Sequence, residues 1–184
     1  MNFDSFSHGQ IHSKIWLCEE LEKFLPKKAK VTILGGWYNV LGFMLLCRRP
    51  NSYESINSID LDPSTLAISD KITNAWAFDP KIVTNTIANV NEFSLDNEEM
   101  VYINCSPEHF ESTEWFNSLP IGSLVCIQSI SITDPNDPWF IRQPNETLDE
   151  FLNKYPITST LYEGTKRIQY SDWGYDRFMI IGYR

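Results

Sequence analysis

A chain of 184 residues with 42% hydrophobic and 14% aromatic residues is expected to fold as one globular domain, which excludes the disordered and fibrous classes. Its formal net charge of -9 makes nucleic acid an unlikely partner, since general binding to phosphate backbones needs a basic surface. No stretch has the roughly 18 apolar residues of a membrane helix, and the N-terminus does not resemble a signal peptide. We therefore expect a cytoplasmic protein with no membrane anchor and with four reduced cysteines.

The first predicted element is a helix over residues 13–25, where apolar residues recur with helical spacing until a proline ends the pattern. The polar segment before it, residues 8–14, has two interpretations. It is either a lid that folds over the edge of a sheet or a plain helix start capped by Ser13. We expect residues 1–29 to form an N-terminal helical segment or lid and residues 30–184 to form the core of the same domain.

A β-α-β unit is predicted next. An apolar run over residues 31–34 ends at Gly35-Gly36, and a second short strand over residues 55–60 ends at Asp60. In such a unit the glycine loop lets the backbone approach a ligand, and an acidic residue about 20 positions later accepts hydrogen bonds from ribose hydroxyls. Alternatively, the glycines make a tight turn and Asp60 caps the next helix, a role for which Asp62 lies closer.

The rest of the chain continues to alternate between strands and helices. Helices are predicted over residues 40–47, 63–77, 110–119 and 148–155, strands over 82–88, 100–103, 123–127, 159–162 and 178–183, and a long loop over 133–144. This alternation predicts a Rossmann-like, doubly wound α/β fold with a mostly parallel sheet in three α/β/α layers. The last two strands have no helix-length segment between them, so they are predicted to close the sheet as an antiparallel hairpin.

Polar or glycine residues follow most of the predicted strands. They are Gly35-Gly36, Asp60, residues 89–91, residues 104–109 and residues 128–129. The carboxyl ends of parallel strands meet at one edge of a sheet, where ligands of open α/β folds bind. The sequence therefore predicts a ligand site at this edge.

With these motifs the chain resembles the class I S-adenosylmethionine (SAM)-dependent methyltransferases over nearly its whole length. The loop Gly35-Gly36-Trp37 resembles the glycine-rich first motif, and Asp60 with Leu61 resembles the strand end that holds the ribose. Asn89-Val90 resembles the border of the adenine, and Asn104-Cys105 the motif that faces the reacting methyl group. The chain departs from the family at Leu34, where an acidic residue is usual, and in its adjacent glycines. The resemblance implies SAM as cofactor.

Candidates for chemistry follow the fourth predicted parallel strand. His109 is predicted as a general base, because it exchanges a proton near neutral pH, and Glu108 beside it as a second catalytic group. Alternatively, these two residues simply open a helix. Cys105 is interpreted as lining the cofactor rather than as a nucleophile. No metal site is predicted, because no His or Cys pair has ligand spacing.

Lys14, Gln128 and Tyr175 are predicted to contact the substrate, which we expect to be a small molecule or a specific protein. The function predicted from these observations is SAM-dependent methyl transfer to that acceptor. Two alternatives stay open: a noncatalytic binding or regulatory module on the same scaffold, and another reaction of SAM such as aminocarboxypropyl transfer or cleavage. Similar scaffolds host many chemistries, so the fold does not separate them.

Overall fold

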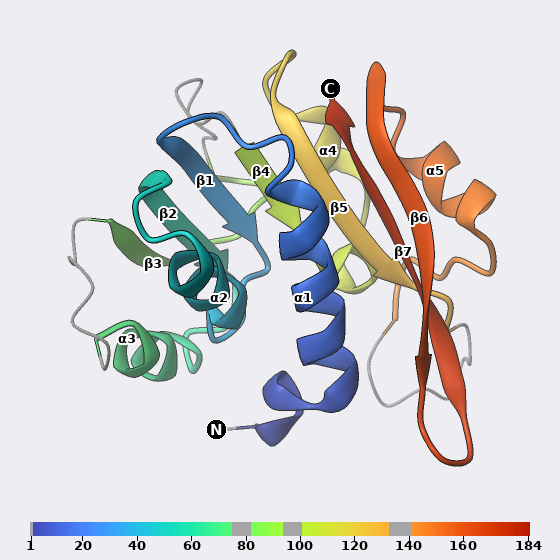
Figure 1. Ribbon diagram of the computed structural model, residues 1–184, viewed down its shortest axis with the longest axis horizontal. Helices are drawn as coiled ribbons and strands as arrows, with labels where there is room; N and C mark the ends of the chain where they lie inside the picture. The colour runs from blue at the N-terminus through green and yellow to red at the C-terminus, as the bar shows by residue number, and fades with distance from the viewer. Residues whose placement is uncertain (1, 75–81, 94–100, 133–140) are drawn as a thin grey trace.

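The computed structural model describes residues 2–74, 82–93, 101–132 and 141–184. A seven-stranded sheet with the order β3-β2-β1-β4-β5-β7-β6 forms its centre (Figure 1). The strands are β1 (Ala29–Leu34), β2 (Tyr53–Asp60), β3 (Val83–Ile87), β4 (Val101–Asn104), β5 (Leu124–Ile130), β6 (Ser159–Gln169) and β7 (Gly174–Tyr183). The helices are η1 (Phe3–Phe6), α1 (His8–Leu21), α2 (Val40–Arg48), α3 (Leu66–Asn74), η2 (Pro107–His109), α4 (Glu114–Asn117) and α5 (Leu148–Lys154).

The first five strands are parallel, and β7 pairs antiparallel with both β5 and β6. The chain runs outward from β1 to β3 and then crosses to β4 on the other side of β1. The strand order thus switches between β1 and β4, the place where ligands bind in doubly wound sheets. The predicted fold class, with its closing antiparallel hairpin, is confirmed.

Both faces of the sheet are buried, as the apolar strands predict. On one face, residues of α1 and α2 such as Leu17 and Leu45 pack with Ile103 of β4. On the other face, residues around α4 and α5 such as Trp115 and Phe151 pack with the strands. Tyr102, next to Ile103 in β4, points into this second cluster, because successive side chains of a strand face opposite sides.

Several predicted boundaries are wrong. Helix α1 begins at His8 with Ser7 as its cap, so Ser13 lies inside the helix, where its hydroxyl donates to the Gln10 carbonyl. The helix predicted over 110–119 is reduced to the short α4, and the short η2 precedes the predicted start. Strand β5 continues to Ile130, and β6 and β7 form a hairpin far longer than predicted. Residues 75–77 of one predicted helix and most of the predicted loop 133–144 lie outside the described residues.

Candidate active site

A cavity of about 730 Å³ lies at the carboxyl ends of the first four parallel strands. It is lined by these residues predicted for the site: Lys14, Gly35, Gly36, Trp37, Asp60, Leu61, Asn89, Val90, Cys105 and His109. Asn104, Glu108, Gln128 and Tyr175, also predicted, do not belong to the lining. The structure thus brings together residues from five separate segments of the chain.

The loop after β1 has an unusual backbone. Gly35, Trp37 and Asn39 have positive φ angles of 68°, 50° and 55°. The left-handed region costs a residue other than glycine roughly 1–2 kcal/mol, so Trp37 and Asn39 must be held there by their surroundings. The amides of Gly35 and Gly36 both donate to the Ile59 carbonyl, which holds the loop against the end of β2.

Asp60 fixes the same loop from its side chain. One carboxylate oxygen accepts from the Trp37 amide at 2.7 Å, and the other accepts from the Asp62 amide at 3.0 Å. Each carboxylate oxygen has a second lone pair, so the group can still accept a hydrogen bond from a ligand. Asp62 instead closes a turn before α3, where it accepts from the amide of Ser64.

The loop after β3 closes the adjoining end of the cavity. Val90 is buried, and together with Ala88 and the exposed Leu61 it supplies apolar surface there. The carbonyl oxygen of the Asn89 side chain accepts from the Asn91 amide, and the amide group of that side chain donates to Glu92. A flat apolar ring would therefore meet aliphatic side chains beside a carboxylate.

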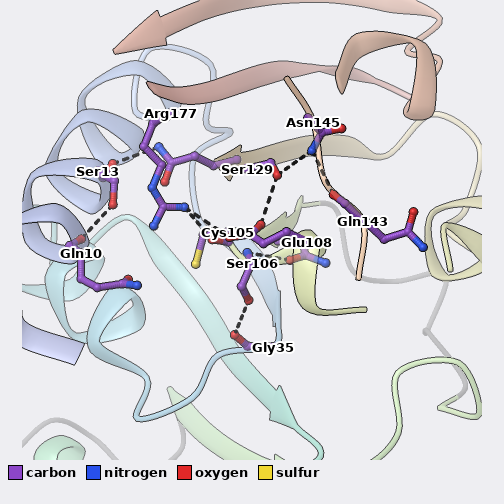
Figure 2. Close-up of polar contacts among 12 residues, drawn as sticks. Gln10, Ser13, Gly35, Cys105, Ser106, Glu108, Ser129, Gln143, Asn145 and Arg177 are labelled. Carbon is purple, nitrogen blue, oxygen red and sulfur yellow. Dashed lines mark hydrogen bonds and ion pairs between the residues drawn. The ribbon is translucent and has the colours of Figure 1, made fainter. Parts of the chain in front are cut away.

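The turn after β4 is tied to the glycine loop. Asn104 is fully buried and accepts from the Ser106 amide with its side-chain oxygen, which shapes the turn from behind the cavity. The Ser106 hydroxyl donates to the Gly35 carbonyl at 3.3 Å, as Figure 2 shows. Ser106 lines the cavity and was not predicted, although it directly follows two predicted residues.

Glu108 lies in a buried network rather than at the cavity (Figure 2). Its carboxylate lies 3.7 Å from the Arg177 guanidinium and accepts a hydrogen bond from Ser129, which in turn accepts one from Asn145. The Glu108 carbonyl accepts from the amides of Arg142 and Gln143. The side chains of Glu108 and Arg177 are only 2% and 3% exposed, so Glu108 is placed as a buried counter-ion and an anchor. His109, next in the chain, is exposed and lines the cavity.

Two predicted substrate residues contact the N-terminal helix instead. The Gln128 side chain donates to the Ser13 carbonyl at 3.1 Å, which joins β5 to α1. Tyr175 is mostly buried and stacks with Trp173 near the hairpin turn. Their placement differs from prediction because β5 and β7 extend beyond the expected strand limits, which carries both residues into regular sheet structure.

The N-terminal segment forms one wall of the cavity. Asn2, Asp4 and Ser5 belong to its lining, and the Asn2 amide donates to the Tyr38 hydroxyl at 3.0 Å. That this segment moves as a lid stays a prediction. No sequence signal marked Asn2 or Asp4, because they lie more than 30 residues before the glycine loop that they approach.

Lys14 enters this wall from α1. Its side chain is buried, and its ammonium donates to the Gln10 side-chain oxygen at 2.5 Å. Burial lowers the pKa of Lys14, and the nearby Arg177 guanidinium lowers it further, while Cys105, Asp4 and Glu108 act in the opposite direction. The cavity lining thus includes the acidic Asp60 after β2 and the buried Lys14 of α1, with Asp4 near the lysine.

No family model and no curated protein matches the sequence. Solved structures do match. MccD protein is 12% identical with a TM-score of 0.72, over 92% of this chain and 96% of the other. YcgJ from Bacillus subtilis is 9% identical with a TM-score of 0.71, over 92% and 98%. A geranyl diphosphate methyltransferase in complex with GPP and sinefungin is 9% identical with a TM-score of 0.68, over 95% and 79%.

The fold is that of the class I SAM-dependent methyltransferases. At such low identities the likeness of this chain to these proteins concerns the fold, and the site must be judged on its own geometry. Within the described ranges, no helix is long and apolar enough to cross a membrane. The same part of the chain holds no cluster of three or more His, Cys, Asp or Glu side chains placed to bind a metal ion.

Proposed function

We propose that this protein is a SAM-dependent methyltransferase that acts on a small-molecule acceptor. The observation that carries the proposal is the Asp60 carboxylate, which lines the cavity at the end of β2 beside the glycine loop. An acidic residue at this position of a Rossmann-like unit accepts hydrogen bonds from ribose hydroxyls. Geranyl diphosphate methyltransferases of the same fold have been crystallised with SAM and with S-adenosylhomocysteine.

The residues present fit such a nucleoside ligand. The volume of about 730 Å³ lies in the range of small-molecule sites, roughly 300–1,000 Å³. Asp60 offers acceptor oxygens for hydroxyl groups, and Val90 with Leu61 offers apolar surface for a base. The aliphatic and polar groups are adjacent, as a ligand with an apolar ring and a hydroxylated sugar requires.

When bound, SAM supplies an electrophilic methyl group on a sulfonium. Methyl transfer is an in-line displacement, so the protein contributes mainly proximity and orientation. We assign His109 as the group that takes a proton from acceptors that must lose one, since it is the exposed imidazole of the cavity lining. Glu108 is assigned no proton transfer, because its carboxylate is engaged with Arg177 and Ser129.

Calorimetric titration with SAM, S-adenosylhomocysteine and NAD tests the proposal. Both sulfur ligands should bind in the micromolar range, and NAD should not. In Asp60→Asn the affinity for both should fall at least tenfold, whereas Asp149→Asn on the exposed surface of α5 should bind like the wild type. Absence of binding to the wild type, or equal affinity in all three proteins, would contradict the proposal.

His109→Gln tests the second assignment separately. With an acceptor found by screening for release of S-adenosylhomocysteine, this variant should keep its affinity for S-adenosylhomocysteine and lose turnover by about 10²-fold or more. The loss should be confined to acceptors that release a proton on methylation. Unchanged turnover on such an acceptor would remove His109 from the mechanism.

A further inference from the structure

Lys14 is a buried lysine whose amino group forms no ion pair in the described structure. Only 8% of this residue is exposed, yet it lines the cavity. Among the described residues its ammonium donates a hydrogen bond to the neutral Gln10 side chain and makes no ion pair with a carboxylate. An ammonium donates three hydrogen bonds, and a buried charge is costly unless it is paired.

A second buried cation, Arg177, lies close to Lys14. Arg177 lies near enough to lower the pKa of Lys14, and Arg177 itself pairs with the Glu108 carboxylate at 3.7 Å. The Asp4 and Glu108 carboxylates raise the pKa of Lys14, but neither forms an ion pair with it in the part of the chain that the structure describes. The Nε atom of Arg177 is itself buried without a hydrogen-bond partner in the described structure. Figure 2 shows the Arg177 side chain between α1 and the turn at Cys105, the side of the cavity that Lys14 lines.

The remaining groups of the cavity do not offer an anion site. The amides of Gly35, Gly36 and Trp37 already donate to the Ile59 carbonyl and the Asp60 carboxylate. Arg142, the other Lys or Arg of the described lining, forms an ion pair with Glu111 at 2.6 Å and is exposed. An anionic ligand group would therefore find its partner at the Lys14 end.

We propose that Lys14 is the carboxylate-binding residue of the cavity, where its ammonium pairs with an anionic group of the bound small molecule. This inference rests on the proposed function for the identity of that molecule. The carboxylate belongs either to the amino-acid part of the cofactor or to the acceptor. In both cases a ligand carboxylate would form a charge-assisted hydrogen bond with the Lys14 ammonium, which has no ion-pair partner in the described structure.

The first part of the test uses two nucleoside thioethers. S-adenosylhomocysteine carries the amino-acid carboxylate, and 5′-methylthioadenosine lacks the amino-acid part. Both are titrated into the wild type, into Lys14→Met and into Lys71→Met, whose lysine is exposed on α3. If Lys14 binds the cofactor, Lys14→Met loses at least tenfold in affinity for S-adenosylhomocysteine and keeps its affinity for 5′-methylthioadenosine.

The second part addresses the acceptor. The melting temperature is measured with S-adenosylhomocysteine bound, in sodium acetate and in sodium chloride of equal ionic strength. If Lys14 binds the acceptor, acetate raises the melting temperature of the wild type and of Lys71→Met but not of Lys14→Met, while nucleoside affinity is unchanged. The proposal is overturned if Lys14→Met matches the wild type both in the nucleoside titrations and in the acetate comparison, or if it loses affinity for both nucleosides equally.

The same set of proteins provides controls for the folding of Lys14→Met and for the proposed function. Lys14→Met should melt at or above the wild-type temperature without ligand, because methionine fills similar apolar space and removes an unpaired charge. A much lower melting temperature would make Lys14 a structural residue and overturn the proposal. If the wild type binds neither nucleoside, the proposed function fails, and the acetate comparison on the ligand-free proteins still decides the role of Lys14.

Discussion

At the scale of single residues, the two buried basic side chains near α1, Lys14 and Arg177, differ in their partners. Arg177 has the Glu108 carboxylate at 3.7 Å, whereas Lys14 has only the Gln10 amide oxygen. Removing one partner of a buried pair leaves the other charge uncompensated, whereas removing a lone charge relieves a cost. The two residues should therefore respond in opposite ways to substitution.

Glu108→Met should lower the free energy of unfolding by about 3–5 kcal/mol, because it leaves the Arg177 guanidinium buried and unpaired. The double variant Glu108→Met/Arg177→Met should be more stable than the sum of the single losses predicts. Urea unfolding of the four proteins in this cycle measures the coupling. Additive losses would mean that the two charges do not stabilise each other.

The lowered pKa of Lys14 predicts a pH dependence of stability. Between this lowered pKa and 10.5 the unfolded chain binds more protons at this site than the folded protein does, so stability rises with pH. The free energy of unfolding of the wild type, relative to Lys14→Met, should therefore increase as the pH rises toward 10.5. Other groups titrate in both proteins and cancel in this difference. A relative decrease would contradict the lowered pKa.

At the scale of elements, the glycine loop is fitted closely against β2. A Cβ atom built on Gly36 would lie 1.9 Å from the hydroxyl oxygen of Ser58, which is buried in β2. Gly36→Ala should lower the free energy of unfolding by about 1–3 kcal/mol through overpacking. Adding Ser58→Ala should restore part of this loss, as thermal unfolding of both variants would reveal. If Gly36→Ala leaves the free energy of unfolding unchanged, the loop can move away from β2.

The wall formed by η1 and its neighbours depends on one hydrogen bond to the same loop. Tyr38→Phe removes the acceptor of the Asn2 amide while keeping the buried ring. Hydrogen exchange over residues 2–7 should become faster, with global stability changed by no more than about 1 kcal/mol. Exchange rates equal to those of the wild type would show that other contacts hold this wall.

Much of the element order could be predicted from sequence, and the exceptions have physical causes. β1 and α2 carry strong apolar signals, and β2 ends at an acidic residue, so the glycine loop and Asp60 could be assigned to the edge where the cavity lies. β6 was shortened in the prediction because it is an edge strand whose exposed side chains are polar and show little hydrophobic alternation. Ser7 could not be recognised as the cap because the segment after it is mostly polar, whereas Ser13 lies just before the apolar run of residues 15–17.

The role of Glu108 could not be predicted, because its partner Arg177 lies 69 positions later in the chain, in β7. A carboxylate beside a histidine has the same sequence pattern whether it faces a cavity or a buried cation. The same holds for three other residues predicted for the site. They lie in β4, β5 and β7 but do not line the cavity: Asn104, Gln128 and Tyr175. Neighbouring elements decide which way such residues face, and local sequence does not specify those neighbours.

At the scale of the whole molecule, the site depends on both halves of the chain. β7 lies between β5 and β6, and its Met179 and Ile181 pack with α1 and α2, while Phe178 and Ile180 pack on the opposite face. A chain of residues 1–158 should therefore lack cooperative unfolding and fail to bind S-adenosylhomocysteine. Calorimetry and circular dichroism would test this. A stable, ligand-binding fragment would mean that the parallel strands fold alone.

The hairpin of β6 and β7 also supports the first helix. Its turn carries Tyr170, whose hydroxyl accepts from the Gly9 amide, and the side chains of Tyr170 and Tyr175 fill the space that a side chain at position 9 would occupy. On the ribosome, α1 is synthesised long before this hairpin exists. Until β7 has been synthesised, α1 lacks the contacts that Tyr170 and Tyr175 make at Gly9. A nascent chain that has not yet reached β7 therefore carries α1 without the support of the hairpin.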